Sequence, residues 1–145
     1  LGILAATAAP KFIDLTSDAR ESVMKGVQGS INSAVNLVHA KALVEGQTGA
    51  TGEILIGTKY YALVHGFPAA IERGTAGATG AGLGIDSLIE LESGSDIKPA
   101  PDATDATIMV FTHSGVTDGT KCQISYTNAT DSETPPKVSA TLTGC

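Results

Sequence analysis

The sequence predicts an α+β fold in which one long helix precedes an antiparallel sheet. Apolar side chains recur every three or four residues from Phe12 to Ala42, which is the spacing of a helix. The last third of the chain instead holds short segments rich in β-branched residues, separated by turn residues. At 145 residues the chain fits one domain with its own core, and a helix followed by strands is the α+β order.

The helix is expected over residues 11–45. Pro10 suits its entrance because the first amides of a helix have no partner within it, and Gly46 suits its end. The expected apolar stripe consists of Phe12, Leu15, Ala19, Val23, Val27, Ile31, Val35, Val38 and Ala42. Such a helix exceeds the usual globular length, which indicates that contacts outside the local fold use it.

Residues 46–104 are expected to form a connecting region of mixed structure. Its predicted elements are strands at 53–56 and 59–65 with a break at Gly66-Phe67-Pro68, one helical turn at 68–73, a flexible loop at 74–84 and a short helix from Ile85 to Leu91. The proline-rich segment from Lys98 to Asp102 is expected to break the chain.

Residues 105–145 are expected to form antiparallel strands and a C-terminal loop. The predicted strands are 107–112, 121–127 and 137–143. Asp118-Gly119 indicates a hairpin between the first two strands, and Pro135-Pro136 marks a longer link before the third.

The chain has two cysteines, Cys122 and Cys145. A cysteine at a chain end is seldom a core thiol, because chain ends fray unless they are tied down. A disulfide would stabilise the fold by about 3 kcal/mol and would indicate an oxidising compartment. The alternative is a pair of free thiols in a cytosolic protein.

Charge and composition argue against nucleic acid as a partner. The net charge is −6, aromatic residues make up 4% and there is no Trp, so neither basic patches nor stacking surfaces are expected. Residues 11–45 carry equal numbers of acidic and basic side chains, so the net charge falls on the rest of the chain. A neutral helix inside an assembly with an acidic, solvated head fits this distribution, as does an ordinary acidic monomer.

The run from Leu1 to Ala9 is apolar except for Thr7 and leads directly into the predicted helix. It is too short to span a membrane, which takes roughly 20 apolar residues. We expect it to be the end of a longer apolar segment. The alternative is the end of a secretory signal peptide, with Ala6-Thr7-Ala8 as a cleavage-like triplet.

The segment from Leu1 to Phe12, with its apolar run passing through Pro10 into an amphipathic helix, resembles the hydrophobic N-terminal segment of type IV pilins. Asp18-Ala19-Arg20, Gly66-Phe67-Pro68 and the late cysteine pair are similar to pilins of the mannose-sensitive haemagglutinin group. The specific part of this resemblance covers about the first third of the chain.

The resemblance implies a ladle-shaped subunit of an extracellular filament that attaches to surfaces and is not an enzyme. The later half of the helix would pack under the sheet, and the earlier half between subunits. The implied assembly residues are Leu1, Ile3, Leu4, Pro10, Phe12 and Leu15. The implied partners are further copies, other pilins, the pilus assembly machinery and, for the full-length form only, the bacterial inner membrane.

The resemblance also implies a leader cleavage site, a methylated first residue and a docking glutamate upstream of Leu1. Without them we expect this chain neither to be processed nor to anchor in a membrane, and we expect no cofactor or metal. Two alternatives stay open. One is a pseudopilin of a type II secretion system, and the other is a secreted module whose loops Gly74–Gly84 and Val116–Lys121 hold a small ligand.

Other motifs favour structural roles. His39, His65 and His113 fall on different predicted elements, without zinc-ligand or triad spacing. Gly80–Gly84 lacks the spacing of a dinucleotide loop, and Asn128-Ala129-Thr130 is a glycosylation sequon. The candidate calcium ligands, which lack calcium-loop spacing, are Asp102, Asp105, Asp118 and Asp131.

Overall fold

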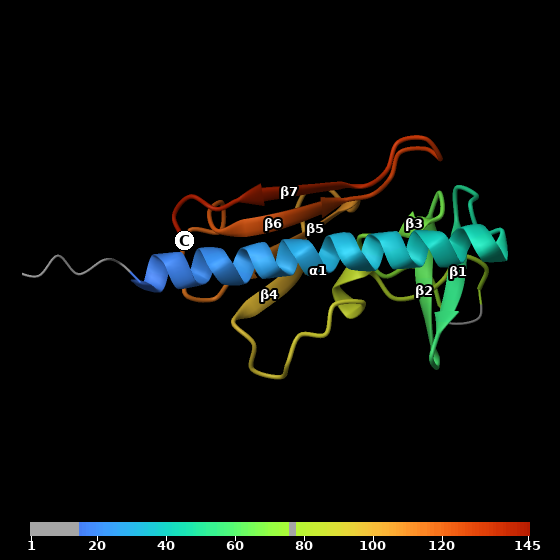
Figure 1. Cartoon of the computed structure of the whole chain (residues 1–145). Helices are drawn as coiled ribbons and strands as arrows, with labels where there is room; N and C mark the ends of the chain where they lie inside the picture. The colour runs from blue at the N-terminus through green and yellow to red at the C-terminus, as the bar shows by residue number, and fades with distance from the viewer. Residues whose placement is uncertain (1–14, 76–77) are drawn as a thin grey trace, which may run out of the picture.

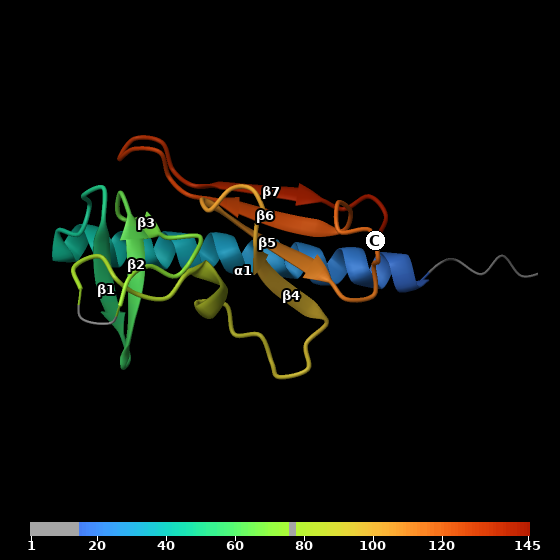
Figure 2. The same cartoon turned by 180° about the vertical axis from the view of Figure 1, so that it is seen from behind.

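The computed structural model describes residues 15–75 and 78–145. Helix α1 (Leu15–Glu45) runs along the molecule, and two antiparallel sheets pack against one side of it (Figures 1 and 2). The α+β prediction is therefore confirmed. The predicted helix is confirmed from Leu15 onward, while residues 11–14 lie outside the described part.

The first sheet packs near the C-terminal end of α1. Its order is β1–β2–β3, and its strands are β1 (Gly52–Ile56), β2 (Lys59–Val64) and β3 (Phe67–Pro68). Leu83 returns beside β2, where its amide donates to the Tyr60 carbonyl at 2.9 Å and its carbonyl accepts from the Ala62 amide at 3.0 Å. The predicted glycine-rich loop is thus tied to this sheet at its later end.

The second sheet is a four-stranded meander that lies along the earlier part of α1 (Figure 2). Its strands, in spatial order, are β4 (Ile97–Pro101), β5 (Ile108–His113), β6 (Gln123–Thr127) and β7 (Lys137–Thr141). The three C-terminal strands and the hairpin between β5 and β6 are confirmed.

Three local predictions are wrong. Residues 68–73 form no helical turn, since Pro68 ends the two-residue strand β3. The predicted helix from Ile85 to Leu91 is only a 3-10 turn, Ile85–Ser87. The segment from Lys98 to Pro101 continues as strand β4, where Pro99 and Pro101 face Phe111 and Met109.

Strand β4 tolerates two prolines because it lies at the edge of its sheet. Alternate residues of a strand direct their amides to the same side. Pro99 and Pro101 are two residues apart, so both missing donors fall on one side of the strand. An edge strand can leave that side without a partner.

The core forms along α1 in two connected parts. The larger cluster joins Met24, Val27, Ile31 and Val35 to the second sheet and to the segment after β3. The smaller cluster joins Val38 and Ala42 of α1 to residues of β1 and β2. Each sheet thus covers a different length of the same helix.

Two buried hydrogen bonds join the two sheets. The Tyr126 hydroxyl donates to the Pro68 carbonyl at 2.6 Å, and the Ala70 amide donates to Oδ1 of Asn128 at 2.6 Å. Both bonds link positions 58 residues apart. The end of β6 and the segment that begins at Pro68 therefore lie side by side and run in the same direction. Burial also raises the pKa of Tyr126, which keeps its hydroxyl protonated as a donor.

The predicted disulfide between Cys122 and Cys145 is present, with the two Cα atoms 4.7 Å apart. Cys122 directly precedes β6, the middle strand of the three C-terminal ones, as expected. Both cysteines belong to the larger core cluster. The disulfide therefore closes the end of the core near the beginning of the described helix (Figure 1).

Candidate assembly surface

The predicted apolar stripe of α1 does not keep to one face of the helix. Leu15 and Val23 are 72% and 46% exposed, whereas the buried side begins at Met24. Successive steps of four residues each turn about 40° beyond a full helical turn. The stripe therefore winds from an exposed face at Leu15 and Ala19 onto the core face at Val27 and beyond.

The exposed residues belong to a second line of small and apolar side chains along α1. Every member is exposed and none is charged; we call this line the uncharged face. It consists of Leu15, Ala19, Ser22, Val23, Gly26, Ser30, Ser33, Leu37, Ala40 and Val44. Leu37 and Val44 are 73% and 88% exposed, so large apolar side chains occur along its whole length.

The charged side chains of α1 flank this face. Lys25 pairs with Glu21 at 2.6 Å, and Lys41 pairs with Glu45 at 3.1 Å, both with the i,i+4 spacing. Arg20 instead donates to the main-chain carbonyl of Cys145 at 3.0 Å. The uncharged face thus remains available for a contact that excludes water, which an unpaired charge would oppose.

Two glycines interrupt the middle of α1, at Gly26 and Gly29. A Cβ atom added at either position would meet nothing within 4 Å. Glycine in a helix interior costs about 0.5–1 kcal/mol relative to alanine, and packing within the subunit does not require it here. Glycine at these two positions would allow another molecule to approach the helix backbone closely, which is a physical reason for its presence.

Of the six predicted assembly residues, only Leu15 lies in the described part of the chain. Its exposure places it at the start of the uncharged face. The other five lie outside the described residues: Leu1, Ile3, Leu4, Pro10 and Phe12.

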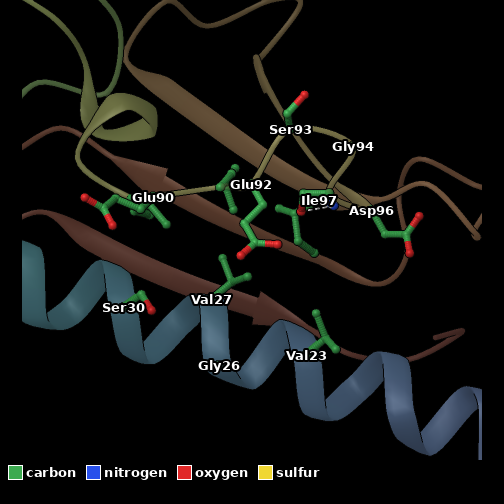
Figure 3. Close-up of a pocket in the computed structure, with 13 residues that line it drawn as sticks. Val23, Gly26, Val27, Ser30, Glu90, Glu92, Ser93, Gly94, Asp96 and Ile97 are labelled. Atoms are coloured by element: carbon green, nitrogen blue, oxygen red, sulfur yellow. Dashed lines mark hydrogen bonds between the residues drawn. The ribbon is translucent and has the colours of Figure 1, made fainter.

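A groove separates α1 from the segment Leu88–Ile97 (Figure 3). It contains a hollow of about 480 Å³. Val23, Gly26 and Val27 line its helix side, and the opposite rim carries Glu90, Glu92 and Asp96. Ser114 donates to Asp96 at 2.6 Å and lowers the pKa of that carboxyl. This groove was not predicted, because helix was expected up to Leu91, where the structure has an irregular segment that only tertiary packing places opposite α1.

The three histidines lie on separate elements, as predicted. His39 stacks on Phe67 at 3.9 Å, and its Nδ1 donates to the Gly66 carbonyl at 2.9 Å. Nδ1 of His113 accepts from the Gly115 amide at 3.0 Å. His65 occupies a turn with φ of 52°. No group of metal-ligating side chains occurs within residues 15–75 and 78–145.

The four candidate calcium aspartates cap their own turns. Oδ1 of Asp102 accepts from the Thr104 amide at 2.8 Å, and Asp131 accepts from the Glu133 and Thr134 amides. The hydrogen bonds from Thr107 and Thr120 likewise lower the pKa of Asp105 and that of Asp118. Asp102 and Asp105 share the loop between β4 and β5, whereas Asp118 and Asp131 lie on two other loops, and all four carboxylates stabilise local structure.

The described parts of the two loops that the alternative ligand-binding module would use lie apart. The one near Gly80 lies against Thr51 at the far end of α1, whereas Gly115 adjoins Arg20 near its beginning. Figure 1 shows the same separation. At Gly82 an added Cβ would come within 2.6 Å of the Ala62 amide nitrogen, so this glycine permits close packing on β2.

The sequon residue Asn128 is only 8% exposed, and its Oδ1 is occupied by the Ala70 amide. Its role in the fold is to join the two sheets.

Together these features define an α+β protein with a long helix, two antiparallel sheets and a C-terminal disulfide. Comparison with protein-family models, curated proteins and solved structures finds no match for the chain. Within the described ranges, no helix is both long and apolar enough to cross a membrane.

Proposed function

We propose that this chain is the structural subunit of an extracellular type IV pilus, similar to the mannose-sensitive haemagglutinin group, that attaches cells to surfaces. It acts by self-assembly through its N-terminal helix and performs no catalysis. Its partners are further copies, other pilins and the assembly machinery, and the full-length form is anchored in the inner membrane before assembly.

The uncharged face of α1 is the observation that carries this proposal. It extends from Leu15 to Val44, and both Gly26 and Gly29 leave room for a second helix to approach. Burying apolar surface contributes roughly 25 cal/mol per Å², without the cost of burying charge. A head-to-tail contact that does not close on itself grows into a filament.

The head supports the same proposal in a coarser way. A long helix, antiparallel sheets and a disulfide that ties Cys145 to β6 are consistent with a pilin-like subunit. The sheets cover one side of α1 (Figures 1 and 2), and every member of the uncharged face is exposed.

The proposal is tested in the native host with two substitutions on α1. Leu37→Glu places a charge on the uncharged face, whereas the matched control Asn36→Glu places it on the neighbouring exposed position. We expect the first variant to lose filaments at least about tenfold, by electron microscopy and by the sheared surface fraction, because charge would be buried between subunits. The control retains them.

Two outcomes would overturn the proposal. One is that antibodies against this chain label no surface filament; a secretion defect in cells lacking the gene would then favour the pseudopilin. The other is that Leu37→Glu assembles as well as Asn36→Glu. Mass spectrometry of the native protein would also show whether a methylated, apolar segment precedes Leu1.

A further inference from the structure

We infer that a hollow between the two sheets binds a single carboxylated sugar unit, of the kind that uronic acids contribute to surface polysaccharides. The hollow has a volume of about 300 Å³ and lies where the residues after β6 meet the end of β2. It shares no residue with the uncharged face of α1. The inference rests on the proposed function in one respect, since attachment of cells to surfaces would be the use of this site.

Arg73 gives the hollow its positive charge. The main chain of Arg73 exchanges two hydrogen bonds with that of Gly82, at 2.9 Å and 2.8 Å. Gly82 packs closely on β2, so the backbone at Arg73 is held in place. The guanidinium itself forms no salt bridge or hydrogen bond with any residue that the structure describes. Arg73 thus offers an anchored guanidinium to an anion from outside the chain.

Asn128 offers a second donor to the hollow. Its main-chain amide donates to the Thr107 carbonyl at 2.9 Å, and its Oδ1 accepts from the Ala70 amide at 2.6 Å. Because a backbone amide can only donate, the second bond fixes the side chain with Nδ2 directed away from Ala70.

The Nδ2 atom of Asn128 has no hydrogen-bond partner among the described residues. Within the same residues, no buried side-chain nitrogen or oxygen is without a partner, so Nδ2 must be accessible from outside. The side chain is only 8% exposed, and the hollow is the space that it lines. Its two N–H groups are therefore oriented toward the hollow before any ligand binds.

These donors favour a carboxylate as the ligand group. The guanidinium of Arg73 and the carboxamide of Asn128 are planar donors that suit the two oxygens of a carboxylate. The hollow carries one positive charge in a chain whose net charge is −6. A singly charged carboxylate is therefore favoured over a doubly charged phosphate, which the surrounding negative potential repels more strongly.

The remaining lining suits the ring of a sugar. The hydroxyls of Thr127 and Thr130 can exchange hydrogen bonds with ring hydroxyls, while Val64 and Ala129 add apolar surface. The volume lies at the small end of the range for ligand pockets, so the hollow accommodates one sugar unit and not a longer chain.

The inference is tested by titrating the purified chain with sodium glucuronate and following amide chemical shifts by NMR. We expect shifts centred on Arg73 and Asn128 with a Kd in the millimolar range, because a small ligand with one ionic contact binds weakly. Glucose is the matched ligand control, since it has the same ring without the carboxylate, and should cause no comparable shifts. Inorganic phosphate tests whether any anion suffices.

Two substitutions test the two donors separately. Arg73→Gln removes the charge and should weaken glucuronate binding at least about tenfold. Asn128→Asp keeps an oxygen acceptor for the Ala70 amide but replaces the free N–H donors with a carboxylate, so it should abolish binding. The control Lys25→Gln removes one positive charge from α1, outside the hollow, and should bind as the parent does. Melting temperatures show whether each variant is folded, and Arg73→Gln alone decides if Asn128→Asp is not.

The inference is overturned if glucuronate causes no shifts near the hollow up to about 50 mM, well above the expected Kd. It is also overturned if glucose or inorganic phosphate binds as tightly, or if Arg73→Gln binds like Lys25→Gln.

A test in the native host separates this inference from the proposed function. Cells carrying Arg73→Gln should assemble normal filaments but attach less to a surface coated with a uronic-acid polysaccharide. Normal filaments of a parent chain that binds no glucuronate would refute only the sugar site. Glucuronate binding by a chain that forms no filaments would refute only the proposed pilus subunit.

Discussion

Arg20 donates a hydrogen bond of 3.0 Å from Nη1 to the main-chain carbonyl of Cys145, across 125 residues of sequence. Cys145 is in turn bonded to Cys122 at the start of β6. Gly115 closes this contact from the other side, since a Cβ there would lie 3.0 Å from two guanidinium nitrogens of Arg20. One side chain thus ties the early part of α1 to the disulfide.

Replacing Arg20 should loosen this junction. Arg20→Ala removes a charged donor to a partly buried carbonyl, so we expect the free energy of unfolding to fall by about 1–2 kcal/mol. Lys25→Ala, which removes only an exposed ion pair with Glu21, should cost less than about 0.5 kcal/mol. Urea denaturation measures both, and equal losses would show that the Cys145 contact contributes nothing.

Reducing the disulfide should lower the melting temperature and release the C-terminal segment first. The bond joins residues with a sequence separation of 23. For a loop of this size the chain-entropy model gives a stabilisation of the folded state of about 3 kcal/mol. Calorimetry with and without reductant measures the shift, and hydrogen exchange locates it. A Cys122→Ser/Cys145→Ser double variant should melt like the reduced protein and be insensitive to reductant. An unchanged melting temperature would contradict the stabilising role.

Asn128→Ala should destabilise the junction between the sheets. The change leaves the buried Ala70 amide without its acceptor, which costs about 1–3 kcal/mol. Thr130→Ala is the control, because it also destroys the sequon but changes an exposed residue. Chemical denaturation of unglycosylated protein should separate the two variants; similar stabilities would mean that the Asn128 bond is dispensable.

The turn aspartates predict acid sensitivity. Hydrogen bonds from Thr120 lower the pKa of Asp118 from 3.8 to about 2, and the pKa of Asp102 is also lowered. A carboxyl whose pKa is lower in the folded state stabilises the fold above its unfolded pKa. That contribution is lost as pH falls from about 4 toward about 2. Unfolding free energies measured across this interval should decline.

Asp118→Asn tests the origin of this decline, because the amide does not titrate. We expect a shallower loss of stability between about pH 4 and pH 2 in the variant than in the parent. An identical pH profile would show that the Asp118 turn does not contribute.

Gly26→Ala should stabilise the isolated subunit while weakening its assembly. The added methyl group meets nothing within 4 Å in the subunit, and alanine favours a helix interior by about 0.5–1 kcal/mol. In the filament the same group would occupy space that the proposed neighbouring helix requires. A higher melting temperature with fewer filaments supports the assembly face, whereas unchanged filament yield argues against close packing at Gly26.

The regular elements were predictable because their signals are local. The helix period, the β-branched segments and the Asp118-Gly119 turn lead to α1, β5, β6 and β7 with small errors at the ends. The prolines misled the prediction for β4. Proline lacks an amide donor, so it is found both at chain breaks and in edge strands. Only pairing with a neighbouring strand shows which of the two is present, and the pairing of β4 with β5 depends on the tertiary fold.

Of the candidate surface, only Leu15 is among the residues that the resemblance implies for assembly. Leu15 is exposed, while its role in assembly stays a prediction, and the rest of the uncharged face, from Ala19 to Val44, is not among those residues. The predicted apolar stripe advances in steps of three or four, and its run of four-residue steps from Leu15 to Val35 passes from one face of the helix to another. The angular positions of the small, uncharged residues around the helix distinguish the two faces. The groove rim at Glu90 depends on tertiary packing, which local sequence does not encode.

The pair of prolines in β4 also limits how copies of this chain can join. A strand from another molecule that approached the β4 edge would find no amide donors at Pro99 and Pro101. It could not add to the four-stranded sheet there with a regular hydrogen-bond ladder. Growth by backbone pairing, which leads to amyloid-like fibres, is disfavoured there. In the proposed filament, subunits would instead join through contacts between side chains, which can be reversed when the filament is dismantled.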